Sequence, residues 1–168
     1  MTIQIGDPLP VGVLSEFVEV ESEGCSIGPN TFKVEDLVKG KTIAVFGLPG
    51  AFTPTCSAKH MPGYVEHASE LKAKGVDEIW CIAVNDAFVM GAWGREQQVA
   101  GAVRMMADGS ATYTKALGLD ADFTKFNMGT RSRRYSMLIV DGVVKQLNLE
   151  ESGKFEVSNA ETLLAQLE

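Results

Sequence analysis

Cysteine is scarce in this chain, and no two cysteines lie close together. The 168 residues include three, at positions 25, 56 and 81. An odd number of scattered cysteines excludes the disulfide framework of small secreted proteins and is typical of a reducing compartment. The lack of a Cys-x-x-Cys pair also argues against a thioredoxin-type disulfide exchanger and against a zinc site.

Positive charge and long apolar runs are also lacking. The chain has 15 Lys and Arg against 22 Asp and Glu, a formal net charge of −7. This balance argues against binding to nucleic acid, which needs a basic surface, and against docking on an anionic membrane. No apolar run approaches the length of a transmembrane helix. Residues 1–8 have neither the basic start nor the apolar core of a secretory signal, so we expect a cytoplasmic protein.

What is present is the composition of an ordinary globular protein. Hydrophobic residues make up 45% of the chain and charged residues 22%. A chain of this length buries most of its apolar surface without disulfide bonds to support it. We therefore expect a single domain that spans residues 1–168.

Strand patterns alternate with helical patterns along the chain. The predicted strands in this alternation are 42–48, 78–84, 103–107, 134–140 and 143–149. The first two are continuously apolar, as in strands that are buried on both faces of a sheet. Asn85 and Asp86 are suited to cap a helix over 87–99, and Asp141-Gly142 is typical of a tight hairpin turn. With an N-terminal hairpin at 11–20, this order is compatible with an α/β, thioredoxin-like fold whose central mixed sheet carries helices on both faces.

Three other segments yield local predictions. Residues 21–30 are polar and rich in glycine, so we expect a loop there, with Cys25 as an incidental exposed thiol. Residues 120–132 are also expected to form a loop. Ser158 and Glu161 have the spacing of a capping box at the start of the last helix.

The most informative stretch covers residues 47–57, which read Gly-Leu-Pro-Gly-Ala-Phe-Thr-Pro-Thr-Cys-Ser. It follows a predicted strand and precedes a helical pattern, which places Cys56 in the first turn of a helix. Backbone N–H groups without acceptors and the positive end of the helix dipole favour a thiolate there. Thr53 brings a hydroxyl toward the same pocket, and Pro49 stiffens the turn. We predict that Cys56 is an activated nucleophile.

Other roles for Cys56 fit the surrounding residues less well. A buried structural cysteine is the common case, but a turn between a strand and a helix typically exposes a reactive atom. Thr53 stands where a dithiol exchanger has its first thiol. A metal site with His60 and His67 lacks a second cysteine at ligand spacing. A phosphatase loop needs an arginine soon after the cysteine, and residues 57–62 contain none.

This stretch resembles the active-site loop of the peroxiredoxins. Their pattern Pro-x-x-x-Thr-x-x-Cys is matched by Pro49, Thr53 and Cys56, and the longer string is similar to the type II, peroxiredoxin-5-like subfamily. The resemblance covers nearly the whole chain, with further landmarks at Val84-Asn85-Asp86, Ala107-Asp108-Gly109, Arg131-Ser132-Arg133-Arg134-Tyr135 and a C-terminal helix. It implies a thioredoxin-like fold and a thiol-specific peroxidase that reduces hydrogen peroxide and organic hydroperoxides to water and alcohols.

A peroxide substrate accounts for these residue types. Attack of the thiolate on one oxygen spreads negative charge over both oxygens as the O–O bond breaks. Thr53 Oγ and the Cys56 N–H are candidate donors to that charge, each worth about 3–4 kcal/mol. Resemblance to the family points to Arg134 as the permanent cation. Arg131 and Arg133 are interpreted as a solvated rim, with support of Arg134 as the alternative role of Arg131.

Turnover requires a second thiol to reduce the sulfenic acid formed on Cys56. Cys81 resembles a cysteine of plant-like type II enzymes and is a candidate resolving residue, although its continuously apolar strand favours an inert core cysteine. Residues 155–158, where other type II enzymes carry a resolving cysteine, contain none. We therefore expect an external thiol as reductant, either glutathione with glutaredoxin or thioredoxin.

The resemblance also implies a homodimer built from loops near the active site, and no metal, haem, flavin or selenium. The alternative function is a peroxide sensor that passes oxidation from Cys56 to a partner protein. His60 is interpreted as a structural hydrogen-bonding residue. Phe52 and Phe126 are interpreted either as an apolar mouth for alkyl hydroperoxides or as core residues.

Overall fold

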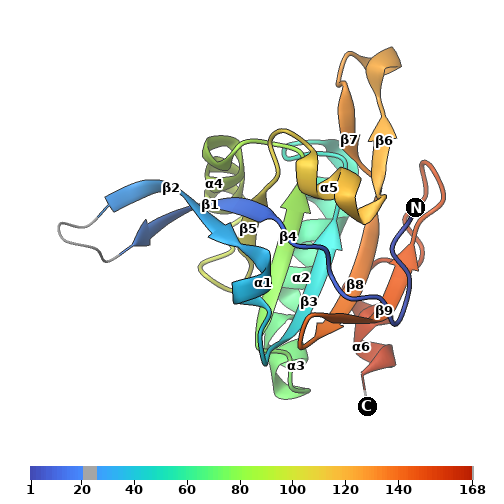
Figure 1. Ribbon diagram of the computed structural model, residues 1–168. Helices are drawn as coiled ribbons and strands as arrows, with labels where there is room; N and C mark the ends of the chain where they lie inside the picture. The colour runs from blue at the N-terminus through green and yellow to red at the C-terminus, as the bar shows by residue number, and fades with distance from the viewer. Residues whose placement is uncertain (21–25, 168) are drawn as a thin grey trace.

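The computed structural model describes residues 1–20 and 26–167 and is built around one central sheet (Figure 1). Its strands are β1 (Val13–Val20), β2 (Ser26–Lys33), β3 (Thr42–Gly47), β4 (Glu78–Ala83), β5 (Arg104–Ala107), β8 (Tyr135–Val140) and β9 (Val143–Leu149). They lie in the order β2-β1-β5-β4-β3-β8-β9. β4 runs parallel to β3 and β5, and the other neighbours pair antiparallel. The predicted mixed sheet is confirmed.

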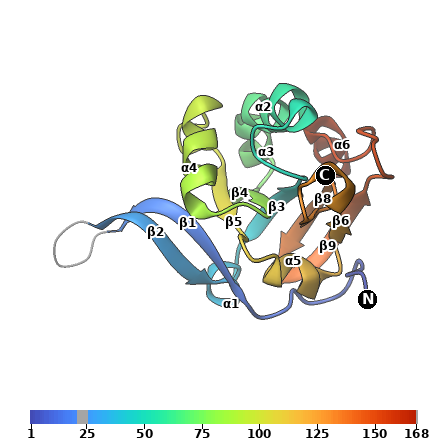
Figure 2. The same cartoon turned by 90° about the horizontal axis from the view of Figure 1, so that it is seen from above.

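Helices cover both faces of this sheet (Figure 2). They are α1 (Val34–Leu37), α2 (Met61–Glu66), α3 (Ala68–Ala73), α4 (Ala87–Glu96), α5 (Thr112–Leu117) and α6 (Ala160–Gln166). Helices α2, α3, α4 and α6 lie on one face, and α1 and α5 lie on the other. Each side of the sheet therefore has its own hydrophobic core.

Strand β3 shows why its sequence is apolar at every position. Ala44 and Phe46 point into the core beneath α2 and α3, whereas Ile43 and Val45 point into the core on the opposite face. Successive side chains of a strand alternate between faces, so a strand covered on both sides has no position left for a polar residue. The next strand, β4, follows the same rule and places Cys81 in the same core as Phe46.

Two predicted loops contain strands. Strand β2 begins at Ser26 and pairs with β1, so the prediction of a loop over 21–30 is wrong for residues 26–30. Its Pro29 is tolerated because β2 is the edge strand of the sheet. Cys25 lies outside the described residues. The expected loop over 120–132 is wrong at both ends, where β6 (Asp120–Asp122) and β7 (Thr130–Ser132) form a short hairpin that stands away from the sheet in Figure 1.

The chain turns at places that its residues specify. Between β8 and β9, Asp141 and Gly142 both have positive φ, at 47° and 78°, as the predicted hairpin turn requires. Asp86 caps α4 by accepting a hydrogen bond from the Val89 N–H. The predicted capping box at α6 is wrong, because Asn159 caps that helix while the Ser158 hydroxyl donates to Glu150.

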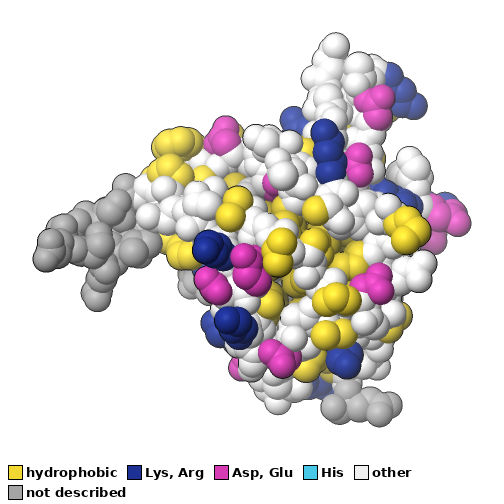
Figure 3. Space-filling view, in the orientation of Figure 1, with side chains coloured by type: hydrophobic (Ala, Val, Ile, Leu, Met, Phe, Trp, Pro, Cys, Tyr) yellow, Lys and Arg dark blue, Asp and Glu magenta, His cyan; other side chains and the backbone are white. Residues whose placement is uncertain are grey.

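The surface carries both signs of charge. On the face seen in Figure 3, basic and acidic side chains are interspersed, and neither sign gathers into a broad patch. Among the helices of residues 1–20 and 26–167, none has the length and apolar character needed to cross a bilayer. The longest helix named above, α4, has 10 residues, about half of the ~20 that a span requires.

Candidate active site

Cys56 lies where the loop after β3 becomes helical. The helical backbone starts at Pro54, and residues Cys56–His60 form a π-helical segment that continues into α2. The predicted position of Cys56 in the first turn is thus confirmed. In this wider turn the Cys56 carbonyl accepts a hydrogen bond from the Met61 N–H. π-Helical turns are rare in proteins, and those that occur are often found at functional sites. The Cys56 side chain is completely buried.

Arg134 reaches this sulfur from the neighbouring strand. It immediately precedes β8, which pairs antiparallel with β3, so that Tyr135 lies opposite Gly47 where β3 ends. The Arg134 Nη2 group donates to Cys56 Sγ at 3.2 Å. A guanidinium at this distance stabilises a thiolate by charge and by hydrogen bonding. The structure thus brings together two residues that are 78 positions apart in the chain.

Gly47 permits this close approach of the two strands. A Cβ atom at Gly47 would lie 2.1 Å from Cε1 of the buried Tyr135 ring. Only glycine therefore fits at this position without displacement of the ring. The fold keeps the start of β8, and with it Arg134, close to the loop that carries Cys56.

Thr53 and Pro49 lie in the loop before Cys56. The Thr53 hydroxyl donates to the Gly50 carbonyl at 2.7 Å, and its own carbonyl accepts from the Ser57 N–H at 2.9 Å. The single hydroxyl proton is thus used within the loop, so the prediction that Thr53 donates to the peroxide is wrong for this structure. The Thr53 oxygen instead has lone pairs left to accept a hydrogen bond from a substrate O–H. The Pro49 carbonyl accepts from Arg131 at 3.5 Å. Arg131 thus holds the loop and is half-buried, unlike a solvated rim residue, while its support of Arg134 stays a prediction.

Two further residues brace this loop, and the sequence indicated neither role. The Asn85 side chain accepts from the Ala51 N–H at 2.9 Å, although Asn85 was predicted only as a helix cap. The buried Trp93 indole donates to Ser57 Oγ at 3.0 Å from α4. No local pattern marks either contact, because each joins elements that are far apart in sequence.

His60 connects Arg134 to the opposite side of the site. Its Nε2–H donates to the Ser158 carbonyl at 3.0 Å, so its Nδ1 has a lone pair that accepts from Arg134 Nη1 at 2.8 Å. Burial, together with the charge of Arg134, lowers the pKa of His60 to about 3. The ring is therefore neutral, as this pair of hydrogen bonds requires. The predicted structural role of His60 includes direct contact with the arginine.

Comparisons with known proteins decide the family. The family model described as Redoxin matches residues 4–164. Peroxiredoxin-2B from Arabidopsis thaliana is 47% identical over 98% of this chain and 98% of its own length. The chain belongs to the type II peroxiredoxins. The predicted family and thiol-dependent peroxidase activity are confirmed.

Solved structures of similar proteins agree with this assignment. Reduced Prx3 from Vibrio vulnificus, crystallised with hydrogen peroxide, has 49% identity and a TM-score of 0.91 over 99% of this peroxiredoxin and 100% of its own chain. A Burkholderia cenocepacia protein provisionally described as a thioredoxin reductase has 61% identity and a TM-score of 0.96, covering 100% and 99% of the two chains. This peroxiredoxin lacks the Cys-x-x-Cys pair of dithiol exchangers. The thioredoxin-like fold expected from the sequence is confirmed.

Cys81 is completely buried in β4, beside Phe46 of β3. Burial raises the pKa of the Cys81 thiol, and the charge of Cys56 adds to that rise. A thiol that stays protonated is a poor nucleophile. In this folded state of the peroxiredoxin, Cys81 therefore has the properties of an inert core cysteine.

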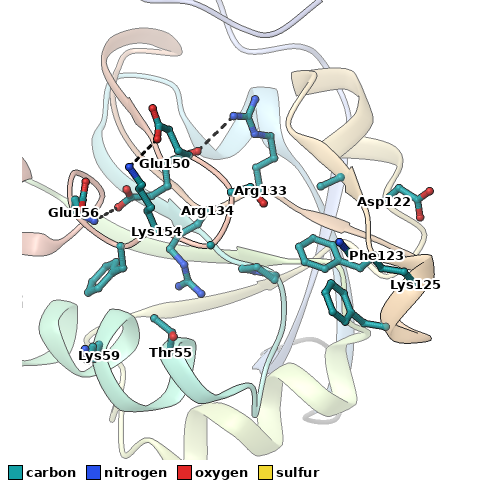
Figure 4. A pocket seen from close by; sticks show the side chains of 17 residues that line it. Thr55, Lys59, Asp122, Phe123, Lys125, Arg133, Arg134, Glu150, Lys154 and Glu156 are labelled. Atoms are coloured by element: carbon teal, nitrogen blue, oxygen red, sulfur yellow. Dashed lines mark hydrogen bonds and ion pairs between the residues drawn. The ribbon is translucent and has the colours of Figure 1, made fainter.

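A cavity of about 940 Å³ opens beside Arg134 (Figure 4). Its wall includes Pro49 from the loop, Thr55 from the helical turn before Cys56, and Phe123 and Phe126 from the β6–β7 hairpin. Phe126 therefore lines this cavity, beside charged residues such as Asp122 and Lys125, and is not a core residue; its role at an apolar mouth stays a prediction. Phe52, the other predicted mouth residue, does not line the cavity; it is 53% exposed and its ring is tilted against that of Trp93.

Titration of His60 is expected to weaken the fold in acid. The folded-state pKa of about 3 lies below the value of about 6.5 in an unfolded chain. The stability contribution is therefore complete above pH ~6.5 and is lost as pH falls toward 3. Between pH 7 and pH 5 the free energy of unfolding should fall by about 2 kcal/mol through this group. Urea unfolding of the wild type and His60→Gln at both pH values measures this, and the variant should lose that part of the dependence.

His67 provides a control of opposite sign. Slight burial lowers the pKa of His67, but its hydrogen bonds to Glu70 and Glu161 outweigh this and raise the pKa. A raised pKa stabilises the fold at low pH and loses that effect as pH rises through the folded-state value. His67→Gln should therefore keep or steepen the loss of stability in acid. Equal pH slopes for the wild type and His60→Gln would contradict the assignment to His60.

Proposed function

We propose that Cys56 is the nucleophile of this thiol-dependent peroxidase. The observation that supports it is the 3.2 Å hydrogen bond from Arg134 to the Cys56 sulfur. The thiolate attacks one peroxide oxygen and the O–O bond breaks. Sulfur keeps that oxygen as a sulfenic acid, and the other oxygen leaves as hydroxide or alkoxide and takes a proton to give water or alcohol.

Arg134, Thr53 and Pro49 complete the proposed machinery. Arg134 stabilises the thiolate before attack and the charge that develops on the oxygens during attack. Thr53 accepts a hydrogen bond from the peroxide O–H and so orients it. Pro49, on the wall of the cavity beside Arg134, limits the access of water. These groups are held by the backbone and by buried partners, so little reorganisation is needed when the O–O bond breaks.

We propose that the substrates include alkyl hydroperoxides as well as hydrogen peroxide. A cavity of about 940 Å³ has room for many water-sized molecules, since one water occupies roughly 30 Å³ in the liquid. Phe123, Phe126 and Phe155 line it and supply apolar surface for an alkyl group. Hydrogen peroxide alone needs neither the volume nor these rings.

We propose that an external thiol, from glutathione with glutaredoxin or else from thioredoxin, reduces the sulfenic acid. Its thiol displaces water from the Cys56 sulfenic acid to form a mixed disulfide, and a second thiol then releases Cys56. The buried and protonated Cys81 supports this proposal, as does the lack of any cysteine in residues 155–158.

Peroxide consumption with the two reductant systems side by side tests this proposal. Cys81→Ser is expected to turn over at the wild-type rate with glutathione and glutaredoxin. A stoichiometric disulfide between Cys56 and Cys81, found by mass spectrometry without reductant, would overturn it. A single round of oxidation with no turnover in either system would favour the alternative of a redox relay.

We also propose a cytoplasmic homodimer. Phe52 lies four residues before Cys56, and Phe126 lines the cavity beside Arg134. Their side chains are 53% and 58% exposed, and such aromatic side chains suit an interface. Sedimentation equilibrium tests the dimer, and cell fractionation tests the location. A monomer at high concentration would contradict the dimer.

A further inference from the structure

A buried carboxylate lies on the far side of the site from Cys56. Glu150 directly follows β9 and is only 4% exposed. Its Oε2 atom accepts four hydrogen bonds, from the backbone N–H groups of Glu156 (2.8 Å), Val157 (2.9 Å) and Ser158 (2.9 Å) and from the Ser158 hydroxyl (2.7 Å). A single side chain thus closes the loop between β9 and α6 (Figure 4).

Glu150 is held as an anion by this loop. Burial raises the pKa of its carboxyl group, but the hydrogen bonds from Ser158 and the backbone outweigh burial and lower the pKa. Among the described residues, no Lys or Arg side chain forms an ion pair with Glu150. Charge-assisted hydrogen bonds are about twice as strong as neutral ones, so four of them hold the Ser158 backbone firmly.

A series of hydrogen bonds connects Ser158 to the Cys56 sulfur. Its carbonyl accepts from His60 Nε2–H and from the Tyr64 hydroxyl, both at 3.0 Å. His60 then accepts from Arg134 Nη1, and Arg134 Nη2 donates to Cys56. Ser158, His60, Tyr64 and Cys56 are all completely buried, so water is excluded from the bonds that orient His60, and His60 in turn directs the half-buried Arg134.

Glu150 also contacts Arg134, at the other end of this series of hydrogen bonds. Its backbone N–H donates to the Arg134 carbonyl at 3.0 Å. One residue therefore anchors the main chain of Arg134 and, through Ser158 and His60, the guanidinium of the same arginine. A guanidinium has a rigid, planar fork of donors, so a small rotation moves Nη2 away from the sulfur.

We infer that Glu150 is a positioning residue of the peroxidase reaction, which aims the Arg134 guanidinium at Cys56 by way of Ser158 and His60. This inference rests on the proposed roles of Cys56 and Arg134. It assigns a function to a loop carboxylate that touches neither the peroxide nor the sulfur. A carboxylate that only closed a loop would affect the stability of the protein and leave the chemistry of the sulfur unchanged.

Glu150→Gln tests the inference because it removes the charge and keeps the shape. Two effects on the Cys56 thiol then have opposite signs. Loss of a nearby negative charge alone lowers the thiol pKa, whereas loss of the aligned guanidinium raises it. We expect the thiol pKa to rise by about one unit, and the second-order rate constant with hydrogen peroxide at pH 7 to fall roughly ten- to hundredfold. Thiolate absorbance against pH and stopped-flow kinetics measure the two quantities.

Glu96→Gln is the matched control. Glu96 is exposed on α4, where its carboxylate accepts a hydrogen bond from the neighbouring Gln97 side chain. This variant makes the same change in net charge and should match the wild type in thiol pKa and in rate. A lower or unchanged thiol pKa in Glu150→Gln, with the wild-type rate, would overturn the inference.

Ser158→Ala keeps the test open if Glu150→Gln does not fold. This variant loses one of the four bonds to Glu150 and keeps the backbone groups, so we expect a smaller change of the same sign. Ser69→Ala, on the exposed surface of α3, is the control. Wild-type values in Ser158→Ala would then overturn the inference.

Peroxidase activity in Cys56→Ser would refute the proposed function itself. An inactive Cys56→Ser beside an unaltered Glu150→Gln would refute only the positioning role.

Discussion

Cys56→Ser is expected to abolish peroxide reduction, with a fall of at least about 10³-fold in the second-order rate constant, in the range seen when catalytic nucleophiles are removed. A serine hydroxyl stays protonated at neutral pH even beside Arg134, so no anion is available to attack the O–O bond. Transfer of an oxygen atom to the serine oxygen would also only form another O–O bond, so no peroxide would be reduced. Hydrogen peroxide consumption in excess dithiothreitol measures the rate.

The control for this variant is Cys81→Ser, which changes the other buried cysteine in the same core. It should keep the rapid first oxidation step, because that step needs only Cys56 and its neighbours. Circular dichroism and the melting temperature establish that both variants are folded. Wild-type peroxide consumption by folded Cys56→Ser would disprove the role of Cys56.

Arg134→Lys should lower the rate with hydrogen peroxide by roughly 10²–10³-fold, the usual effect of removing one preorganised donor. Arg134 uses two different nitrogens at once, Nη2 for Cys56 Sγ at 3.2 Å and Nη1 for His60 at 2.8 Å. A lysine has one ammonium group on a flexible stem and does not reproduce this fork, although the positive charge is kept. The loss therefore measures geometry more than charge. Stopped-flow kinetics under pseudo-first-order conditions report it.

Arg95→Lys provides the comparison for this substitution. Arg95 lies on α4, with its guanidinium 5.9 Å from the centre of the Phe17 ring and no contact with the loop of Cys56. This variant should retain the wild-type rate. An unchanged rate in Arg134→Lys, with the fold intact, would remove Arg134 from the mechanism.

Much of the architecture was predictable because neighbouring residues decide it. The run at β3 is apolar on both faces, and Asp141-Gly142 adopts the positive φ angles that such a turn demands. The predictions that were wrong concern segments whose structure is decided by residues far away in the sequence. The three-residue strands of the β6–β7 hairpin are too short to show alternation, and the polar start of β2 is a strand because β1 pairs with it.

In the candidate site, too, residues close together in the sequence were predictable, and contacts between distant residues were not. Pro49, Thr53 and Cys56 lie within eight consecutive residues, so a strand that turns into a helix places them together wherever the rest of the chain goes. Arg134 was identified by resemblance to a family, since nothing near it in sequence indicates a neighbour 78 residues away. Asn85, Trp93 and Glu150 were found only in the folded protein.

The sequence by itself determined the local parts of this peroxiredoxin: the buried strands, the turns, and a thiol at the start of a helix. Backbone conformation and side-chain periodicity depend on residues a few positions apart, and these are visible in a single chain. Only the tertiary structure decided what surrounds the thiol. The path from Glu150 through Ser158 and His60 to Arg134 depends on how β8, β9 and the loop before α6 pack against α2, and such contacts leave no spacing in the sequence from which to infer them.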